Sequence, residues 1–317
     1  MRFFLIKQFK ELALHLRNYF KPEISNLKFL LGQSAIISSR AASNNFKDLW
    51  DAEVKVYSQW GEDGILDYIC EAVGISKPNV IEIGSGNFTE CNSRFLAESR
   101  NANIIAVDGR NDLTDNVKSS SVFWKSEIIP LVEWVTPDKI NSIILLGEEK
   151  FGKIDIFSID LDGNDYWIIK EANLTQIDIV VLEYNPIFGA IKEVTVPRDD
   201  EFDRYKKHFS GLYYGASLKA YVKLLGNKNF VFIGTNRVGN NAFFVKNNLL
   251  RNFKIATPSN LERYVDWRIR ESREESGRLS YLSGKDRLEI IRELPLIELT
   301  TQSEVNVSSL IVTQVQI

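Results

Sequence analysis

Acidic side chains follow two predicted strands, at the points where those strands end. Asp160, Asp162 and Asp165 come at the end of one strand, and Glu183 and Asn185 come at the end of the next. Residues two apart on a strand point to the same side, so Asp160 and Asp162 share a face. Carboxylates crowded at one edge of a sheet are costly unless a positive charge binds there. The pattern therefore predicts a site for a cationic group.

Two kinds of cation fit this site. One is a positively charged cofactor, which Asp160 would position. The other is a divalent metal, because hard cations take oxygen ligands and Glu183 could supply one more. The spacing is not specific for any metal, so no metal is assigned. A further interpretation is that Asp162 or Asp165 only caps a helix.

A glycine-containing loop follows the predicted strand 79–84. Gly84 and Gly86 let the backbone turn sharply and approach a ligand at the carboxyl edge of a sheet. The dinucleotide fingerprint needs a third glycine where this sequence has Thr89, which counts against a pyrophosphate-containing cofactor. The loop indicates a nucleotide-like cofactor without a pyrophosphate, although a purely structural turn is an alternative.

Asp108 ends the next predicted strand, about two dozen residues after Gly84. A carboxylate at this place can accept hydrogen bonds from both ribose hydroxyls of an adenosine cofactor. The alternative, a turn or helix-capping aspartate, is less favoured because Asp108 and the glycine loop would meet at adjacent strand ends. We predict that Gly84, Gly86 and Asp108 bind S-adenosylmethionine and that Asp160 helps to position it.

Transfer of a methyl group to a hydroxyl requires a base for the hydroxyl proton. The chain has only two histidines, His15 and His208, and neither lies at a strand end. We therefore expect a carboxylate base, with Asp162 as the first candidate and Glu183 as the second.

Short runs rich in Ile and Val alternate with helical patterns, which is typical of a parallel sheet covered on both faces. The predicted strands are 79–84, 102–108, 121–125, 153–161 and 177–183, and the predicted helices are 90–100, 136–149, 165–172 and 216–225.

Two last predicted strands, 230–235 and 242–245, are joined by only six residues. This connection is too short for a crossover helix, so the two strands must pair antiparallel. A seven-stranded, mostly parallel sheet with one antiparallel strand in a closing hairpin is the Rossmann-like α/β fold of class I methyltransferases. Nicotinamide-binding domains end in a parallel strand, so a nicotinamide-dependent enzyme is the least favoured function.

The chain divides into three predicted parts: 1–45, the methyltransferase domain 46–248 and the extension 249–317. The first contains an amphipathic helix, whose apolar stripe ends before Pro22, and a linker over 31–45. Basic residues on this helix permit peripheral contact of residues 2–20 with a membrane, although packing on the core is favoured. The extension is strongly charged, and we expect it to be helical.

Composition limits the possible compartments and partners. A content of 44% hydrophobic and 26% charged residues is ordinary for a globular protein, and no transmembrane segment or signal peptide is predicted. Two cysteines, Cys70 and Cys91, are too few for a disulfide framework, which favours the reducing cytoplasm. The net charge of −3 gives no reason to expect nucleic acid, so we predict no nucleic-acid partner.

Several motifs, taken in order between residues 57 and 245, resemble those of the FkbM-type methyltransferases from bacterial surface-polysaccharide gene clusters. They are Tyr57–Leu66 (YSQWGEDGIL), Ile81–Gly86 (IEIGSG), Ser158–Asp165 (SIDLDGND), Glu183–Asn185 (EYN), Tyr214–Leu218 (YGASL) and Gly239–Val245 (GNNAFFV). The resemblance implies O-methylation of a sugar, a glycan intermediate or a related small molecule. It also places Gln59, Glu62, Asp63 and Glu82 near the cofactor.

The FkbM pattern usually has Asp-x-Glu-Gly-x-Glu where this sequence has Asp160, Asp162 and Asp165, so each carboxylate has a different reach. We assign Asp165, Asn185 and Tyr214 to the acceptor substrate. The long stretch between Pro186 and Ala216 fits a lid or substrate loop, or else an ordinary surface loop. The alternative function is a non-catalytic scaffold with the same fold in a glycan-biosynthesis complex.

Overall fold

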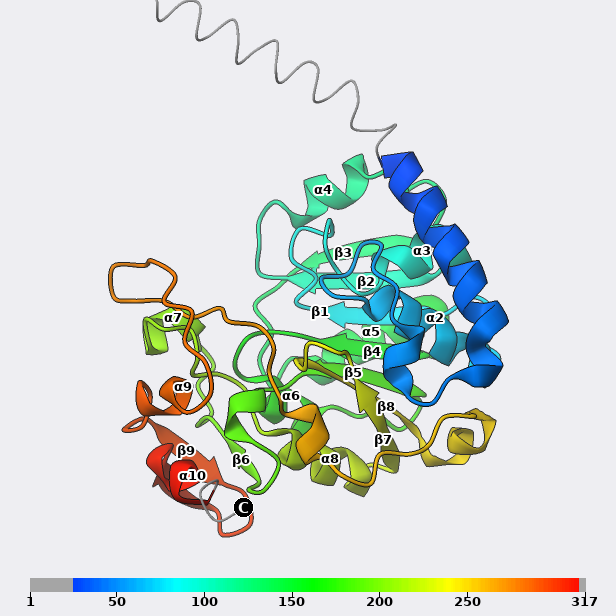
Figure 1. Ribbon diagram of the computed structural model, residues 1–317. Helices are drawn as coiled ribbons and strands as arrows, with labels where there is room; N and C mark the ends of the chain where they lie inside the picture. The colour runs from blue at the N-terminus through cyan, green and yellow to red at the C-terminus, as the bar shows by residue number, and fades with distance from the viewer. Residues whose placement is uncertain (1–24, 314–317) are drawn as a thin grey trace, which may run out of the picture.

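The computed structural model describes residues 25–313, whose centre is a seven-stranded sheet (Figure 1). The strand order is β3-β2-β1-β4-β5-β8-β7, and only β8 runs antiparallel to its neighbours. This arrangement confirms the predicted fold, including the closing hairpin. The strands are β1 (Asn79–Ile83), β2 (Asn103–Asp108), β3 (Ile128–Val132), β4 (Ile156–Ile159), β5 (Ile179–Glu183), β7 (Phe230–Thr235) and β8 (Asn241–Lys246).

Helices cover both faces of the sheet. Because neighbouring strand residues point to opposite faces, Ile81 contacts one helical layer and Val80 the other. One layer contains α5 (Ile140–Phe151), α6 (Asp165–Glu171) and α8 (Leu218–Asn227), and the other contains α2 (Glu62–Val73), α3 (Arg94–Arg100) and α4 (Leu113–Ser119).

Two of the predicted elements are displaced. Residues 121–125, predicted as the third strand, form a turn in which Trp124 is exposed, and the strand paired with β2 is β3 instead. The helix predicted over 136–149 begins at Ile140, where the apolar face that packs on the sheet begins. In both cases burial against the sheet decides the position of the element.

The linker predicted over 31–45 is wrong, because residues 25–42 form a helix. It lies along α2 and α3 in Figure 1. Ile36 is buried, Phe29 packs beside it, and Gly32 lets the helix come close to Val56: a Cβ added there would lie 2.4 Å from a Val56 methyl. The predicted amphipathic helix ending before Pro22, and the membrane contact of residues 2–20, lie outside the described residues.

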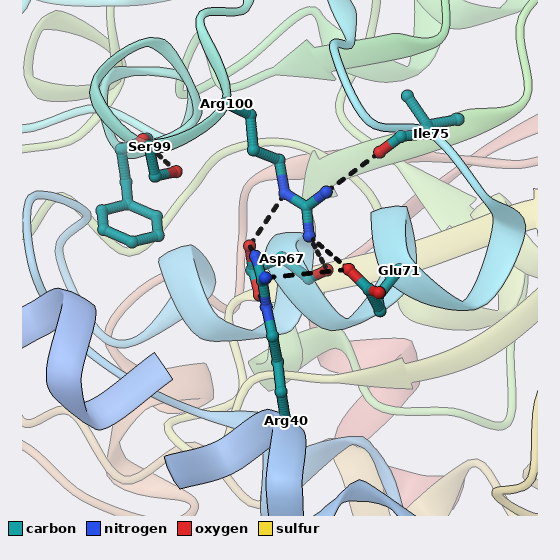
Figure 2. Close-up of polar contacts among 7 residues, drawn as sticks. Arg40, Asp67, Glu71, Ile75, Ser99 and Arg100 are labelled. Atoms are coloured by element: carbon teal, nitrogen blue, oxygen red, sulfur yellow. Dashed lines mark hydrogen bonds and ion pairs between the residues drawn. The ribbon is translucent and has the colours of Figure 1, made fainter. Parts of the chain in front are cut away.

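An ion-pair network holds this helix to α2 (Figure 2). Arg40 donates two hydrogen bonds of 2.6 and 2.7 Å to the carboxylate of Asp67, which is buried. Arg100 donates to the same carboxylate at 2.8 Å and to Glu71 at 3.0 Å. A fork of donors on a planar guanidinium fits a carboxylate well, so Asp67 orients both arginines.

Residues 249–317 were predicted to form a helical extension, and for the described part of this region the prediction of helix is wrong. Between residues 249 and 313, helix is confined to short turns, and β9 pairs with β6 in a second sheet of order β10-β9-β6. In the segment 263–273, Trp267 is buried and Arg287 donates to its carbonyl, and beyond a 3-10 turn at its start the chain there forms no regular helix or strand. The elements of this region are β6 (Val194–Thr195), η4 (Asn247–Asn252), η5 (Glu262–Tyr264), α9 (Asp286–Glu289), β9 (Pro295–Glu298), β10 (Ser303–Asn306) and α10 (Ser308–Thr313).

Within residues 25–313, we find no helix whose length and apolar character would let it cross a membrane.

Candidate functional site

A cleft of about 500 Å³ opens at the carboxyl ends of β1, β2 and β4. We call it the glycine-loop cleft. Its lining includes the predicted cofactor residues Gly84, Gly86, Asp108 and Asp160, together with Trp134, which no motif in the sequence indicates. The carboxyl edge of a parallel sheet is where α/β folds bind ligands.

Gly84 is required by the geometry of this loop. Its φ is +83°, and a Cβ at this position would lie 1.7 Å from the carbonyl oxygen of Asp160. The Gly84 amide donates to the carbonyl of Val107 at 2.8 Å, which ties the loop to β2. Only glycine lets the loops after β1 and β4 approach this closely.

Asp108 lines the glycine-loop cleft and fixes the backbone on two sides of it. Oδ2 accepts a 2.8 Å hydrogen bond from the Gly86 amide, and Oδ1 accepts one of 2.9 Å from the Arg110 amide. Burial raises the pKa of Asp108 above its usual value. A carboxylate oxygen has two lone pairs, so each oxygen retains one for a ligand.

Trp134 lies across the same cleft and is 54% exposed. Its indole Nε1 donates to the carbonyl of Asp200 at 2.7 Å, and its ring would meet a Cβ at Gly109 within 3.2 Å. The exposed indole is therefore held in place and can stack on a flat ligand.

A second cleft of about 220 Å³ shares Asp160 and Asp162 with the first. We call it the aromatic cleft. Its remaining lining is aromatic and polar, and it includes Gln59, Trp60, Glu183, Arg204, Tyr214 and Trp267. The structure thus places Gln59, which was predicted near the cofactor, in this second cleft with Glu183 and Tyr214 and outside the lining of the glycine-loop cleft.

The two clefts meet at a cluster of carboxylates. Oxygens of Asp160, Asp162 and Glu183 lie within 4.8 Å of one another. Burial and the neighbouring carboxylates raise the pKa values of Asp160 and Glu183 well above their usual range. These two groups therefore hold protons more firmly than isolated carboxylates do.

Arg204, from the short helix α7 (Arg204–Lys207), partly neutralises this cluster. Its guanidinium forms an ion pair with Asp162 and lies 4.1 Å from the ring centroid of Tyr214. It also donates to the carbonyl of Gly211. Arg204 stands 42 residues after Asp162 in a run of mixed charges, and no spacing in the sequence indicates the contact.

Glu62 and Asp63 lie outside the glycine-loop cleft, where their carboxylates are buried and shape a neighbouring loop. Glu62 accepts hydrogen bonds of 2.9 Å from the amides of Trp60 and Gly61. Asp63 accepts bonds of 2.7 to 2.8 Å from three amides, those of residues 56–58, while burial raises its pKa to about 6. Both residues thereby hold the loop that carries Gln59 and Trp60.

Glu82, Asp165 and Asn185 also lie outside the lining of both clefts. Glu82 accepts from two amides at the start of α3, at 2.7 and 2.9 Å. Asp165 accepts from the amides of residues 161 and 163, and burial raises its pKa to about 6. Asn185 donates 3.0 Å bonds to the carbonyls of residues 212 and 214, so it supports the Tyr214 segment rather than a ligand directly.

No protein-family model matches the chain, and no curated protein matches it. Among solved structures, a protein of Pyrococcus horikoshii described as a "putative RNA methyltransferase" has 13% identity and a TM-score of 0.35 over 67% of this chain and 96% of that one. The human methyltransferase 10 domain containing protein has 9% identity and a TM-score of 0.34 over 67% and 98%. These likenesses are weak, and the fold assignment rests on the strand order itself.

A further structural relative corrects one prediction. The catalytic domain of hMettl16, solved in complex with the MAT2A 3′UTR hairpin 6, has 7% identity and a TM-score of 0.31 over 67% of this chain and 77% of that one. The prediction that this protein has no nucleic-acid partner is therefore wrong, because net charge does not exclude nucleic acid. Net charge describes the whole surface, whereas nucleic-acid binding depends on local charge.

Proposed function

We propose that this protein is an S-adenosylmethionine-dependent methyltransferase that methylates a hydroxyl group. The methyl donor would bind in the glycine-loop cleft and the acceptor in the aromatic cleft. The observation that carries this proposal is the wall that the two clefts share, Asp160 and Asp162. Methyl transfer requires donor and acceptor to meet in line, and two adjoining clefts provide that arrangement.

The glycine-loop cleft suits the adenosine part of the donor. The remaining lone pairs of Asp108 are available to the two ribose hydroxyls, and the exposed face of Trp134 can stack on the adenine. Gly84 and Gly86 leave room for close approach to the ligand, and no pyrophosphate needs to be held. The closing antiparallel hairpin also favours this function over a nicotinamide enzyme.

The carboxylate cluster is the candidate for receiving the hydroxyl proton. Asp162 is neutralised by Arg204, whereas Glu183 is buried beside Asp160 and has a raised pKa. A carboxylate with a raised pKa binds a transferred proton more firmly than one paired with a guanidinium, so Glu183 replaces Asp162 as the first candidate.

A sugar or glycan intermediate is the acceptor class that we propose. The resemblance to FkbM-type methyltransferases supports it, as do the aromatic rings of Trp60, Tyr214 and Trp267 beside polar groups of the same cleft. The free, buried thiols of Cys70 and Cys91 support a cytoplasmic location.

Calorimetric titration with S-adenosylmethionine and S-adenosylhomocysteine tests the donor site. We expect Asp108→Asn to weaken binding by about 1–3 kcal/mol, because charge-assisted hydrogen bonds to the ribose are lost while the side chain keeps its shape. Asp112→Asn is the matched control, since Asp112 is exposed and its ion pair is with Arg110. Absence of binding to the wild type would refute the proposal. Binding without transfer to any fractionated glycan would favour the scaffold alternative.

A further inference from the structure

The carboxylate cluster holds more negative charge than its surroundings neutralise. Asp160 and Asp162 follow β4, Glu183 ends β5, and their oxygens lie within 4.8 Å of one another. Arg204 is the basic residue among those lining the aromatic cleft, and its ion pair is with Asp162. A bound cation would favour the ionised form of all three carboxylates, and three ionised carboxylates with one guanidinium leave two negative charges, the complement of a divalent cation.

A buried polar atom beside the cluster also lacks a partner. Among the described residues, no hydrogen bond reaches the hydroxyl of Tyr214, which is 1% exposed. Tyr214 lines the aromatic cleft. A buried polar atom without a partner is destabilising unless a ligand satisfies it. Because Tyr214 is not part of the cluster, it is an independent indication that a polar ligand binds at this place.

The separation of the oxygens fits an ion between them. Oxygens on opposite sides of a cation are separated by twice the metal–oxygen distance, about 4.2 Å for Mg²⁺ and about 4.6–5.2 Å for Ca²⁺. Oxygens that are adjacent around an ion lie closer together than opposite ones, so the limit of 4.8 Å is compatible with an ion of either size. Oxygen-only ligands are also those that hard divalent cations prefer.

We propose that Asp160, Asp162 and Glu183 bind one hard divalent cation, of the Mg²⁺, Mn²⁺ or Ca²⁺ class, at the junction of the two clefts. Its binding stands on the cluster alone, while its role in the reaction rests on the proposed function. There the ion would orient an oxygen of the acceptor and make its hydroxyl more acidic. Glu183 would then act as a ligand first, and the acidified hydroxyl would need only a weak base.

Ion binding can be measured without any methyl donor or acceptor. Tb³⁺ replaces hard divalent cations, and Trp60 and Trp267 in the aromatic cleft can transfer excitation energy to it. We expect Tb³⁺ luminescence to saturate at one ion per chain and to be displaced by Mg²⁺, Mn²⁺ or Ca²⁺. Glu183→Gln and Asp162→Asn should each weaken ion binding by roughly 10–100-fold or more, because each removes a charged ligand.

Glu271→Gln is the control, because Glu271 lines the same cleft but lies outside the cluster. Its ion affinity should stay within about twofold of the wild type. Circular dichroism and thermal unfolding of each variant distinguish loss of an ion ligand from loss of the fold. Because Asp162 is partly exposed, its substitution should disturb the fold less than that of the buried Glu183.

Two results would overturn the ion site. One is the absence of a displaceable Tb³⁺ signal in the wild type, and the other is an ion affinity in Glu183→Gln and Asp162→Asn that equals that of the wild type. Either would mean that the carboxylates share protons instead of an ion. Titration with S-adenosylmethionine, in the presence of Mg²⁺ and of a chelator, then separates the two proposals. Failure of the donor to bind despite a bound ion would refute the methyltransferase and leave the ion site standing.

Discussion

Gly84 and Gly86 share the sign of their backbone φ angle but have different surroundings. Both have a positive φ, +83° and +57°. A Cβ at Gly84 would overlap the backbone of Asp160, whereas a Cβ at Gly86 would meet no atom within 4 Å. The first glycine is required by packing, and the second is required only by its backbone conformation.

Alanine substitution should separate these two requirements. Gly86→Ala should lower the free energy of unfolding by about 1–2 kcal/mol, the cost of an L-residue in the left-handed region. Gly84→Ala should cost more, because the loops after β1 and β4 must also move apart. Urea denaturation measures both values, and an equal loss in the two variants would contradict the close contact with Asp160.

Some residues of the site could be found from the sequence because their position alone defines their role. Gly84 and Asp108 end adjacent strands, and the structure places both at one cleft. Glu62, Asp63 and Asp165 could not be assigned in this way. The sequence does not distinguish a carboxylate that accepts hydrogen bonds from backbone amides from one that accepts them from a ligand. Only the folded loop shows the difference.

At the scale of elements, the helix 25–42 depends on a carboxylate that two arginines share. Asp67 has a side chain that is 2% exposed, Arg100 one that is 7% exposed, and Arg40 one that is 40% exposed. An ion pair that is partly in water contributes little, but a buried charge without its partner is costly.

Substitutions in this network should therefore have unequal effects. Asp67→Ala should destabilise the protein by about 3–5 kcal/mol, because Arg100 is left buried without its main partner. Arg40→Ala should cost only about 0.2–1 kcal/mol, because Arg100 still pairs with Asp67. Chemical unfolding of both variants is the test. A loss in Arg40→Ala as large as that in Asp67→Ala would show that the exposed arginine dominates.

The sequence predicted most elements because Ile and Val recur in the buried strands, as in β1 and β5. It failed where local composition and tertiary packing disagree. Residues 31–45, rich in Ser, Ala and Asn, were predicted as a linker, but Gly32 within them is what allows a helix to lie close to Val56. Residues 121–125 were predicted as a strand, but the strand that pairs with β2 on the side away from β1 is β3.

Over the whole molecule, the C-terminal segment supports the aromatic cleft. β9 pairs with β6, and the hydroxyl of Tyr213 donates to the carbonyl of Pro295. Leu296 is fully buried in the cluster that also contains Tyr214 and Trp267. Among residues 249–313, none lines the glycine-loop cleft, whose lining residue Phe202 nevertheless packs in the same cluster.

Leu296→Ala should consequently affect the aromatic cleft more than the glycine-loop cleft. We expect a loss of about 2–5 kcal/mol in stability and faster proteolysis within residues 186–216, because the buried leucine leaves a cavity under that stretch. Affinity for S-adenosylmethionine should fall less than acceptor binding does, because Phe202 is the lining residue of the glycine-loop cleft that packs in the Leu296 cluster. The exposed Glu304→Ala on β10 is the control. A parallel fall in donor affinity would mean that the two clefts depend on a common support.

This division also sets the order in which the two clefts can be completed during synthesis. Every lining residue of the glycine-loop cleft lies between residues 84 and 202, so that cleft can form before the last third of the chain leaves the ribosome. The aromatic cleft joins Gln59 to Glu271 and needs the strand pairing of β9, close to the C-terminus. A nascent or truncated chain would therefore hold a methyl donor before it could accept a substrate.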